Sequence, residues 1–438
     1  MDVNEVIVWI LMICMVLGGL DRAIGNRFGL GEKFEEGFMA LGPLALAMVG
    51  VISLAPVLAK ILEPVVVPVY EFLGADPSMF ATTLLANDMG GYFLAIELAR
   101  DPDAGLLAGL ILGAMMGPTI VFTIPVALGI IEKEDRIFLA QGVLAGMITI
   151  PLGVLVGGLV AGFDPAMVLA NLVPIVLAAL LIAIGLWRIP EKMTTGFLRF
   201  GKGLVALISV GLVVAVFEYM TGVAIMPEGW ELAPPTDGLF VVGLIGMMLL
   251  GAFPAVYLII TFAAKPLTKV GRSIGINDKA AGGMIATLAN NIPMFQILKE
   301  MDPRGKVLNV AFAVSAAFTF GDHLGFTAGV ERTMIFPMIV GKLTAGITAV
   351  LVAYLFFRRT YPAYVEGVSP SVPTETGAGP STGPGVVAGH PETGSTGMVP
   401  GAPLTDASPA DTPAQHRSAD GPAHRAAPGG TPAAPADA

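Results

Sequence analysis

Six polar residues whose chemistry suits a small cation stand in stretches that are otherwise apolar. They fall in three motifs, "TTLLANDMGGYF" (82–93), "LANNIPM" (288–294) and "GDHLGF" (321–326). The six are Asn87, Asp88, Asn290, Asn291, Asp322 and His323. Carboxylate and amide oxygens accept hydrogen bonds, and a carboxylate at the centre of a membrane helix costs about 2.5–3.5 kcal/mol, so it usually binds or relays something. The motifs predict a cation site, with Asp88 facing the cation and Asp322 on the far side of the same cavity.

Each motif also has a purely structural interpretation. Asp88 can cap a helix that begins at Gly90, and either asparagine of "NNIP" can cap a helix that has Pro293 in its first turn. Asp322 and His323 can hydrogen-bond each other inside the protein. Both interpretations stay open for Asp88, because a capping carboxylate also cancels the positive helix start that would repel a cation.

Other kinds of site lack the residues that they need. His323 is the sole histidine before the C-terminal tail and Cys14 is the only cysteine, which argues against multi-histidine or thiolate metal centres. "GRSIG" (271–275) matches a hydrolase pattern but has no buried strand before it, and the phosphate-binding pattern G-x-x-x-x-G-K-[ST] does not occur. The sequence predicts no enzyme, no metal and no cofactor.

The elements that must position the three motifs are membrane-spanning helices. The 438 residues are 55% hydrophobic and 13% charged, with a mean hydropathy of +0.78, whereas soluble domains carry roughly 25% charged residues. About 20 apolar residues suffice to cross a bilayer. We expect an all-α polytopic membrane protein with about nine transmembrane helices, and no nucleic-acid partner. The spans are about 4–20, 38–59, 104–131, 137–163, 165–187, 204–220, 238–264, 307–330 and 334–357.

Two polar-interrupted segments, about 78–99 and 280–298, are expected to be re-entrant hairpins that do not cross the membrane. Most of the 24 Lys and Arg residues then fall in loops on one side, and the loops of the other side receive only Lys60, Arg100 and Arg332. Because cytoplasmic loops are enriched in Lys and Arg, the N-terminus is predicted outside and the C-terminus in the cytoplasm. If 280–298 crossed, the basic loops 265–279 and 299–306 would lie on opposite faces.

The chain also resembles itself. "LANDMGG" (85–91) aligns with "LANNIPM" (288–294), and "GPTIVFTIPV" (117–126) aligns with "GDHLGFTAGV" (321–330). Two repeat units, about 38–131 and 238–330, would begin five spans apart and therefore have opposite orientations. Secondary transporters are often built from such inverted repeats, with the substrate near the midplane where discontinuous helices meet.

The chain divides into a transmembrane domain, residues 1–364, and a tail, residues 365–438. Pro, Gly, Ser, Thr and Ala dominate the tail, which contains no aromatic residue. Such a segment buries too little apolar surface to offset the entropy of ordering. The tail is predicted to be disordered, cytoplasmic and dispensable for activity.

Several long runs resemble the bacterial ethanolamine-utilisation permease family, EutH, over about residues 1–357. They are "FEEGFMALGPLALAMVG", "PVYEFLGADPSMFATTLLANDMGG", "GLILGAMMGPTIVFTIPVALGIIE", "ATLANNIPMF" and "RGKVLNVAFAVSAAFTFGDHLGF". The resemblance implies uptake of ethanolamine across the cytoplasmic (inner) membrane of bacteria that degrade it with an adenosylcobalamin-dependent ammonia-lyase. Ethanolamine has one primary ammonium and one hydroxyl, which the six polar residues and freed carbonyls suit. The tail has no counterpart in the resemblance.

Other functions stay open at this point. A channel, or a carrier of choline, an amino acid or another small polar solute, would have similar spans. Quaternary ammonium recognition usually needs aromatic cages, and the hairpins offer chiefly Phe80, Tyr92, Phe93 and Phe295. A membrane-embedded enzyme would use Asp322 and His323 as acid and base, but no nucleophile or cofactor motif accompanies them. Neither the coupling ion nor the oligomeric state follows from the sequence.

Overall fold

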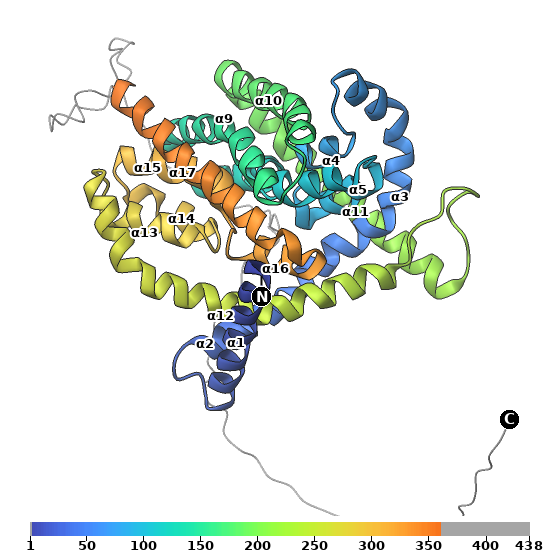
Figure 1. Cartoon of the computed structure of the whole chain (residues 1–438), viewed down its shortest axis with the longest axis horizontal. Helices are drawn as coiled ribbons and strands as arrows, with labels where there is room; N and C mark the ends of the chain where they lie inside the picture. Colours follow the sequence, from blue (N-terminus) through green and yellow to red (C-terminus); the bar gives the residue numbers. More distant parts are fainter. Residues whose placement is uncertain (1, 361–438) are drawn as a thin grey trace, which may run out of the picture. The chain divides into compact units, whose positions relative to one another are not determined.

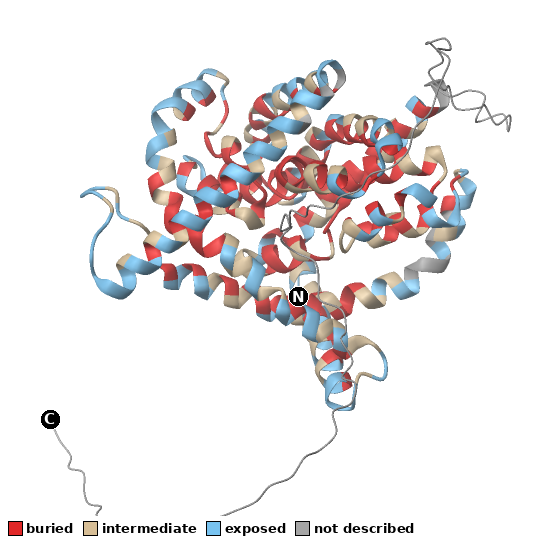
Figure 2. Cartoon of the chain, turned by 180° about the vertical axis from the view of Figure 1, so that it is seen from behind, coloured by how far each residue is buried: buried red, intermediate tan, exposed pale blue. Residues whose placement is uncertain are grey.

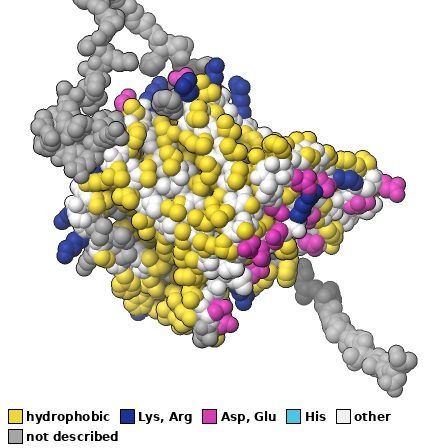
Figure 3. Space-filling view, turned by 45° about the horizontal axis from the view of Figure 1, so that its top comes forward, with side chains coloured by type: hydrophobic (Ala, Val, Ile, Leu, Met, Phe, Trp, Pro, Cys, Tyr) yellow, Lys and Arg dark blue, Asp and Glu magenta, His cyan; other side chains and the backbone are white. Residues whose placement is uncertain are grey.

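The computed structural model describes residues 2–360, and every regular element in that range is a helix. Eight of these helices or helix runs are long and apolar enough to cross a membrane. Figure 1 shows their arrangement, and Figure 3 shows a face on which hydrophobic side chains predominate over a broad area. The all-α polytopic class is confirmed for the described residues. The tail at 365–438 lies outside them.

The described part opens with α1 (Val3–Ala23), which begins with a capping box formed by Asp2 and Glu5, and continues with α2 (Leu30–Met39). A first unit then comprises α3 (Leu41–Phe72), α4 (Ser78–Leu84), η1 (Asn87–Met89), α5 (Gly91–Leu98), α6 (Pro102–Leu106), η2 (Leu107–Leu112), α7 (Met116–Pro118), η3 (Thr119–Thr123), α8 (Ile124–Ile130), η4 (Lys133–Asp135) and α9 (Arg136–Val160). The connecting helices are α10 (Pro165–Arg188) and α11 (Pro190–Thr221). A second unit comprises α12 (Pro235–Ser273), α13 (Asp278–Thr287), α14 (Ile292–Gln296), η5 (Leu298–Glu300), α15 (Pro303–Ala316), α16 (Asp322–Val330), η6 (Arg332–Met334) and α17 (Ile335–Thr360).

The two units have the same order of elements. Each begins with a long helix, continues with two half-helices and a helix broken in its middle, and ends with one 3₁₀ turn and another long helix. This is the order that a duplicated unit would produce, and it covers the segments 38–131 and 238–330 that the sequence pairs. The repeat itself stays a prediction.

Eight of the nine expected spans correspond to the eight candidate helices or helix runs, and the span at 307–330 was wrong as a continuous helix. It is divided into α15 and α16 by an irregular segment, 317–321. Phe318 has a positive φ of 63°, and the backbone N–H groups of Phe318 and Phe320 donate to the carbonyls of Thr287 and Leu288, at 3.1 and 2.9 Å. Because these bonds go to a neighbouring segment, apolar composition alone did not reveal the break.

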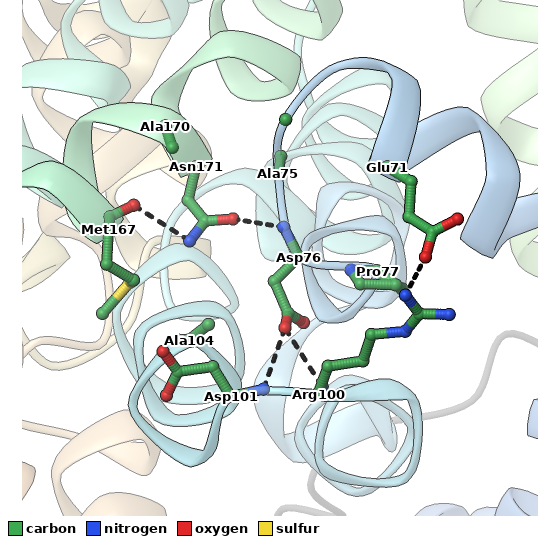
Figure 4. Close-up of a pocket in the computed structure, with 11 residues that line it drawn as sticks. Glu71, Ala75, Asp76, Pro77, Arg100, Asp101, Ala104, Met167, Ala170 and Asn171 are labelled. Carbon is green, nitrogen blue, oxygen red and sulfur yellow. Dashed lines mark hydrogen bonds and ion pairs between the residues drawn. The ribbon is translucent and has the colours of Figure 1, made fainter.

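Both polar-interrupted segments are hairpins whose two ends meet. At the base of the first hairpin (α4, η1 and α5), the Asp76 carboxylate accepts from the backbone N–H groups of Arg100 and Asp101, each at 3.0 Å (Figure 4). At the base of the second (α13 and α14), Asp302 accepts from the backbone N–H of Asn277 at 2.8 Å. Each segment therefore returns to the end of the molecule at which it entered.

The two hairpin bases lie at opposite ends of α9. The start of α9 adjoins the second base, where Lys306 forms an ion pair with Asp135. Its far end leads into α10, whose Asn171 accepts from the backbone N–H of Asp76 at 2.7 Å (Figure 4). A helix of 25 residues spans about 37 Å, which is enough to separate the two faces of a bilayer. The hairpins thus enter from opposite ends and point toward each other.

The core lies where the hairpins and broken helices meet. Figure 2 shows buried residues concentrated in the middle of the described part, and α9 packs along α15 and α17 there. The run from Pro102 to Ile130 is 94% buried over its most apolar window, whereas that of α1 is 17% buried. The broken helices are therefore enclosed by the others, as irregular backbone at membrane depth requires.

Candidate substrate site at the helix breaks

Four interruptions of helix converge in the core. We call 85–90 the first hairpin break, 113–115 the first helix break, 288–291 the second hairpin break and 317–321 the second helix break. Within the first unit, the backbone N–H of Asn87 donates to the carbonyl of Gly113 at 2.9 Å, and η1 contacts α16 of the second unit. Thr119 of the first unit also contacts the second unit, because its hydroxyl donates to the carbonyl of Val314 in α15 at 2.9 Å.

One glycine in each unit allows a hairpin break to lie directly against a broken helix. A Cβ on Gly117 would be 1.9 Å from the carbonyl oxygen of Leu85, and a Cβ on Gly321 would be 2.2 Å from that of Ala289. Both distances are far below any real contact, so no side chain fits at either position. The paired glycines of the two aligned motifs therefore serve the same packing in the two units.

The first hairpin break has a polar lining without partners. Asn87 is fully buried, and neither its amide oxygen nor its amide nitrogen has a hydrogen-bond partner. Asp88 is partly exposed. The cap of α5 is Gly90, and no side chain bonds there. The interpretation of Asp88 as a cap of that helix is therefore wrong.

The second hairpin break is neutral and mostly satisfied. The side-chain oxygen of Asn290 accepts from the backbone N–H of Ile292 at 2.8 Å, and the side-chain nitrogen of Asn291 donates to the Thr123 hydroxyl at 3.0 Å. Pro293 stands in the first turn of α14, as expected. The amide oxygen of Asn291 is buried without a partner, so it adds one open acceptor.

Asp322 and His323 stand in the first turn of α16 but do not act as the mutual pair that the sequence allows. His323 is buried, and its Nδ1 lies 2.9 Å from Nζ of Lys342 in α17. The same Nζ donates to the backbone carbonyl of Ala114 in the first helix break. Phe318 lies against the imidazole, with ring centroids 5.2 Å apart.

Lys342 is a buried charged residue of the crossing that the sequence interpretation does not include. It lies within the expected last span, 334–357, and its side chain is only 1% exposed. A lysine near the middle of an apolar helix is a signal in itself, because a charge at membrane depth usually marks a pathway or a partner. Its partners, however, come from two other segments of the chain.

A cavity of about 140 Å³ opens beside the second hairpin break. Asp322 and Asn290 line its polar side, Phe253 and Tyr257 of α12 line its apolar side, and Glu36 of α2 contributes a second carboxylate. Lys33 of α2 also lines the cavity and forms an ion pair with Glu36. Asp322 is therefore the carboxylate of the cavity that has no ion-pair partner among the described residues, and it could accept from a small cation.

The structure brings the six predicted residues together around this crossing, with different exposures. Asn290 and Asp322 line the cavity, whereas Asn87, Asn291 and His323 are buried behind it. Asp88 is not among the described residues that line the cavity. No group of three His, Cys, Asp or Glu side chains that could hold a metal ion occurs between residues 2 and 360.

A second cavity, of about 270 Å³, lies at the base of the first hairpin. Figure 4 shows that its polar groups bind one another, with Arg100 paired to Glu71 and Asp76 held by backbone N–H groups. Because these bonds close the hairpin, the residues around this cavity have a structural role.

Comparison with known proteins gives a consistent set of relatives. The family described as "Ethanolamine utilisation protein, EutH" matches residues 3–356. A protein of Listeria monocytogenes named "Probable ethanolamine permease EutH" is 62% identical over 359 residues, covering 82% of this chain and 95% of its own. Proteins of Salmonella typhimurium and Escherichia coli with the same name are 51% and 52% identical, covering 84% and 81% of this chain and 98% and 96% of their own. No solved structure matches.

Proposed function

The chain belongs to the EutH family of ethanolamine-utilisation proteins, and we propose that it is a permease that carries ethanolamine across the cytoplasmic membrane of a bacterium. Transport, and not catalysis, is the activity in the names of its relatives. The observation that supports the proposal best is the crossing of the four breaks, which places Asp88, Asp322, the partnerless amide of Asn87 and the open amide oxygen of Asn291 in an apolar membrane domain.

The chemistry of the crossing matches the substrate group by group. Protonated ethanolamine presents three ammonium N–H donors and one hydroxyl, which donates and accepts. The carboxylates of Asp88 and Asp322 supply charged acceptors, and the open amide of Asn87 supplies both a donor and an acceptor for the hydroxyl. The C-terminal ends of half-helices, where carbonyls are exposed, also favour a cation. We place the ammonium between the two carboxylates.

The arrangement favours alternating access over a fixed pore. The hairpins enter from opposite ends and each packs on a broken helix, so rocking one unit against the other would expose the crossing to each side in turn. In the present state, the cavity beside Asp322 and Asn290 reaches Lys33 and Glu36 of α2. The charge distribution assigns α2 to the cytoplasmic side, so we interpret this cavity as the inner route to the site.

The proposed orientation has its N-terminus outside and the base of the second hairpin inside. Lys279 and Lys299 lie at that base and are 58% and 59% exposed, so single cysteines there, in a Cys14→Ala background, would report its side. Neither should react with an impermeant thiol reagent added to intact cells, whereas a cysteine at Glu71, in the first hairpin's base, should react. Labelling of Lys279→Cys without labelling of Lys299→Cys would mean that the second hairpin crosses.

Uptake of labelled ethanolamine into proteoliposomes tests the function directly. We expect saturable uptake that unlabelled ethanolamine inhibits, and at least about tenfold lower uptake with Asp322→Asn, a neutral side chain of the same shape. Asp103→Asn is a matched control, because Asp103 is exposed at the first hairpin's base, away from the breaks. Absence of uptake by the wild-type protein would overturn the proposal, and stronger inhibition by choline than by ethanolamine would reassign the substrate.

A further inference from the structure

The ammonium of Lys342 contacts an unwound backbone carbonyl, the kind of group that binds a dissolved cation in many carriers. In carriers with discontinuous helices, unwound backbone carbonyls coordinate the coupling ion. Here the carbonyl of Ala114, in the first helix break, receives the ammonium of Lys342. The sequence explains why this carbonyl is open: in a regular helix it would accept from residue 118, and Pro118 has no N–H.

The surroundings of Nζ are those of a bound ion and not of a salt bridge. Its two partners are the Ala114 oxygen and His323 Nδ1, the latter at 2.9 Å. Between residues 2 and 360 no carboxylate lies within ion-pair distance of it. An ammonium has three N–H donors, so one remains for a further acceptor at the crossing.

The contacts of Lys342 also join the first unit to the second, and alternating access requires these two units to move relative to each other. Ala114 belongs to the broken helix of the first unit, His323 to that of the second unit, and Lys342 to the helix that follows it. His323 adjoins Asp322, which lines the cavity. A cation at Nζ therefore bridges the units beside the place proposed for the substrate ammonium.

We propose that the Lys342 ammonium is a built-in cation, which occupies the site formed by the Ala114 carbonyl and the His323 ring in place of a dissolved coupling ion. The inference rests on the permease function proposed above and deepens it. It follows that the carrier transports ethanolamine without Na⁺ or K⁺. It also follows that removing the amine leaves a site for a small monovalent cation such as Na⁺ or methylammonium.

The test compares uptake of labelled ethanolamine in media that contain N-methylglucamine, Na⁺ or added methylammonium as the cation. Wild-type initial rates should agree within about twofold in all three. Lys342→Met, which keeps most of the aliphatic stem, should lose at least about tenfold in N-methylglucamine and regain at least about threefold with Na⁺ or methylammonium. Lys60→Met is the matched control, because Lys60 also donates to a backbone carbonyl, that of Gly229 at 2.7 Å, but is exposed and remote from the breaks.

The results that would overturn the built-in cation differ from those that would overturn the permease function. Wild-type uptake that requires Na⁺, or Lys342→Met uptake that equals the wild type in N-methylglucamine, would overturn the built-in cation while leaving the permease intact. If Lys342→Met does not fold, thermal unfolding of Lys342→Gln replaces it. Stabilisation of that variant by Na⁺, without stabilisation of the wild type, supports the inference, and equal responses of the two proteins contradict it.

Discussion

The two hairpin breaks share a backbone arrangement but differ in chemistry. The first contains Asp88 and a buried Asn87 without partners, whereas the second contains two amides that are mostly bonded to Ile292 and Thr123. The helices that follow the helix breaks show the reverse: α16 begins with Asp322, where the aligned motif of the first unit has Pro118. Each unit thus contributes one carboxylate, from different elements. The comparison teaches that two units with the same order of elements can present different chemistry where they meet.

The four charged or titratable groups around the crossing, Asp88, Asp322, His323 and Lys342, are distributed unequally between the two units. Because Pro118 has no N–H, the Ala114 carbonyl in the first helix break is open for Lys342, which lies beside His323. The first unit therefore supplies the backbone acceptor, and the second unit supplies the ammonium and the ring that meet it.

The largest effect is expected where the units are alike. A methyl group on Gly117 or Gly321 would collide with a backbone carbonyl that cannot move independently. Gly117→Ala and Gly321→Ala should each abolish recovery of monodisperse protein, measured by fluorescence-detected size-exclusion chromatography. Gly129→Ala and Gly282→Ala are matched controls, since a Cβ there meets nothing within 4 Å. Tolerance of one substitution and not the other would break the equivalence of the units.

The hairpin bases should differ in stability. Lys306 and Asp135 are nearly buried, with side-chain exposures of 12% and 4%, whereas Arg100 and Glu71 are about half exposed, at 54% and 50%. Removing one partner of a buried pair typically costs about 3–5 kcal/mol, and an exposed pair contributes up to about 1 kcal/mol. Lys306→Met should therefore lower the midpoint of thermal unfolding much more than Glu71→Gln. Equal shifts would show that the second base is hydrated.

Removing an amide should have a smaller effect on stability, with opposite signs in the two hairpin breaks. Asn87→Ala removes a buried amide without partners and should raise the free energy of unfolding by about 1 kcal/mol. Asn290→Ala removes the bond to Ile292 and should lower the free energy of unfolding by about 1 kcal/mol. Asn87→Ala should nevertheless reduce ethanolamine uptake. Thermal unfolding and uptake are measured on the same preparations. A loss of stability in Asn87→Ala would show that its amide is satisfied in the membrane.

Much of the fold was predictable because the membrane restricts it strongly. Hydropathy identified eight spans, and the cost of Asp88 and Asp322 in apolar sequence directed attention to segments in which the structure interrupts a helix. The division of 307–330 was not predictable, since it depends on bonds from Phe318 and Phe320 to the second hairpin. The contacts of Lys342 were not predictable for the same reason: its partners, Ala114 and His323, are distant in the chain and meet only after the helices pack.

The central claim is that Asp88 contacts the substrate ammonium and has no capping role. Equilibrium binding of labelled ethanolamine to purified wild type, Asp88→Asn and Asn291→Asp tests it most directly, because Asn291 is the aligned residue of the second hairpin break. Asp88→Asn keeps the shape and removes the charge. It should bind at least about tenfold more weakly, equivalent to roughly 1.4 kcal/mol, with an unchanged unfolding midpoint, and Asn291→Asp in the Asp88→Asn background should not restore the affinity. Normal binding by Asp88→Asn would contradict the account and leave Asp322 as the partner of the ammonium.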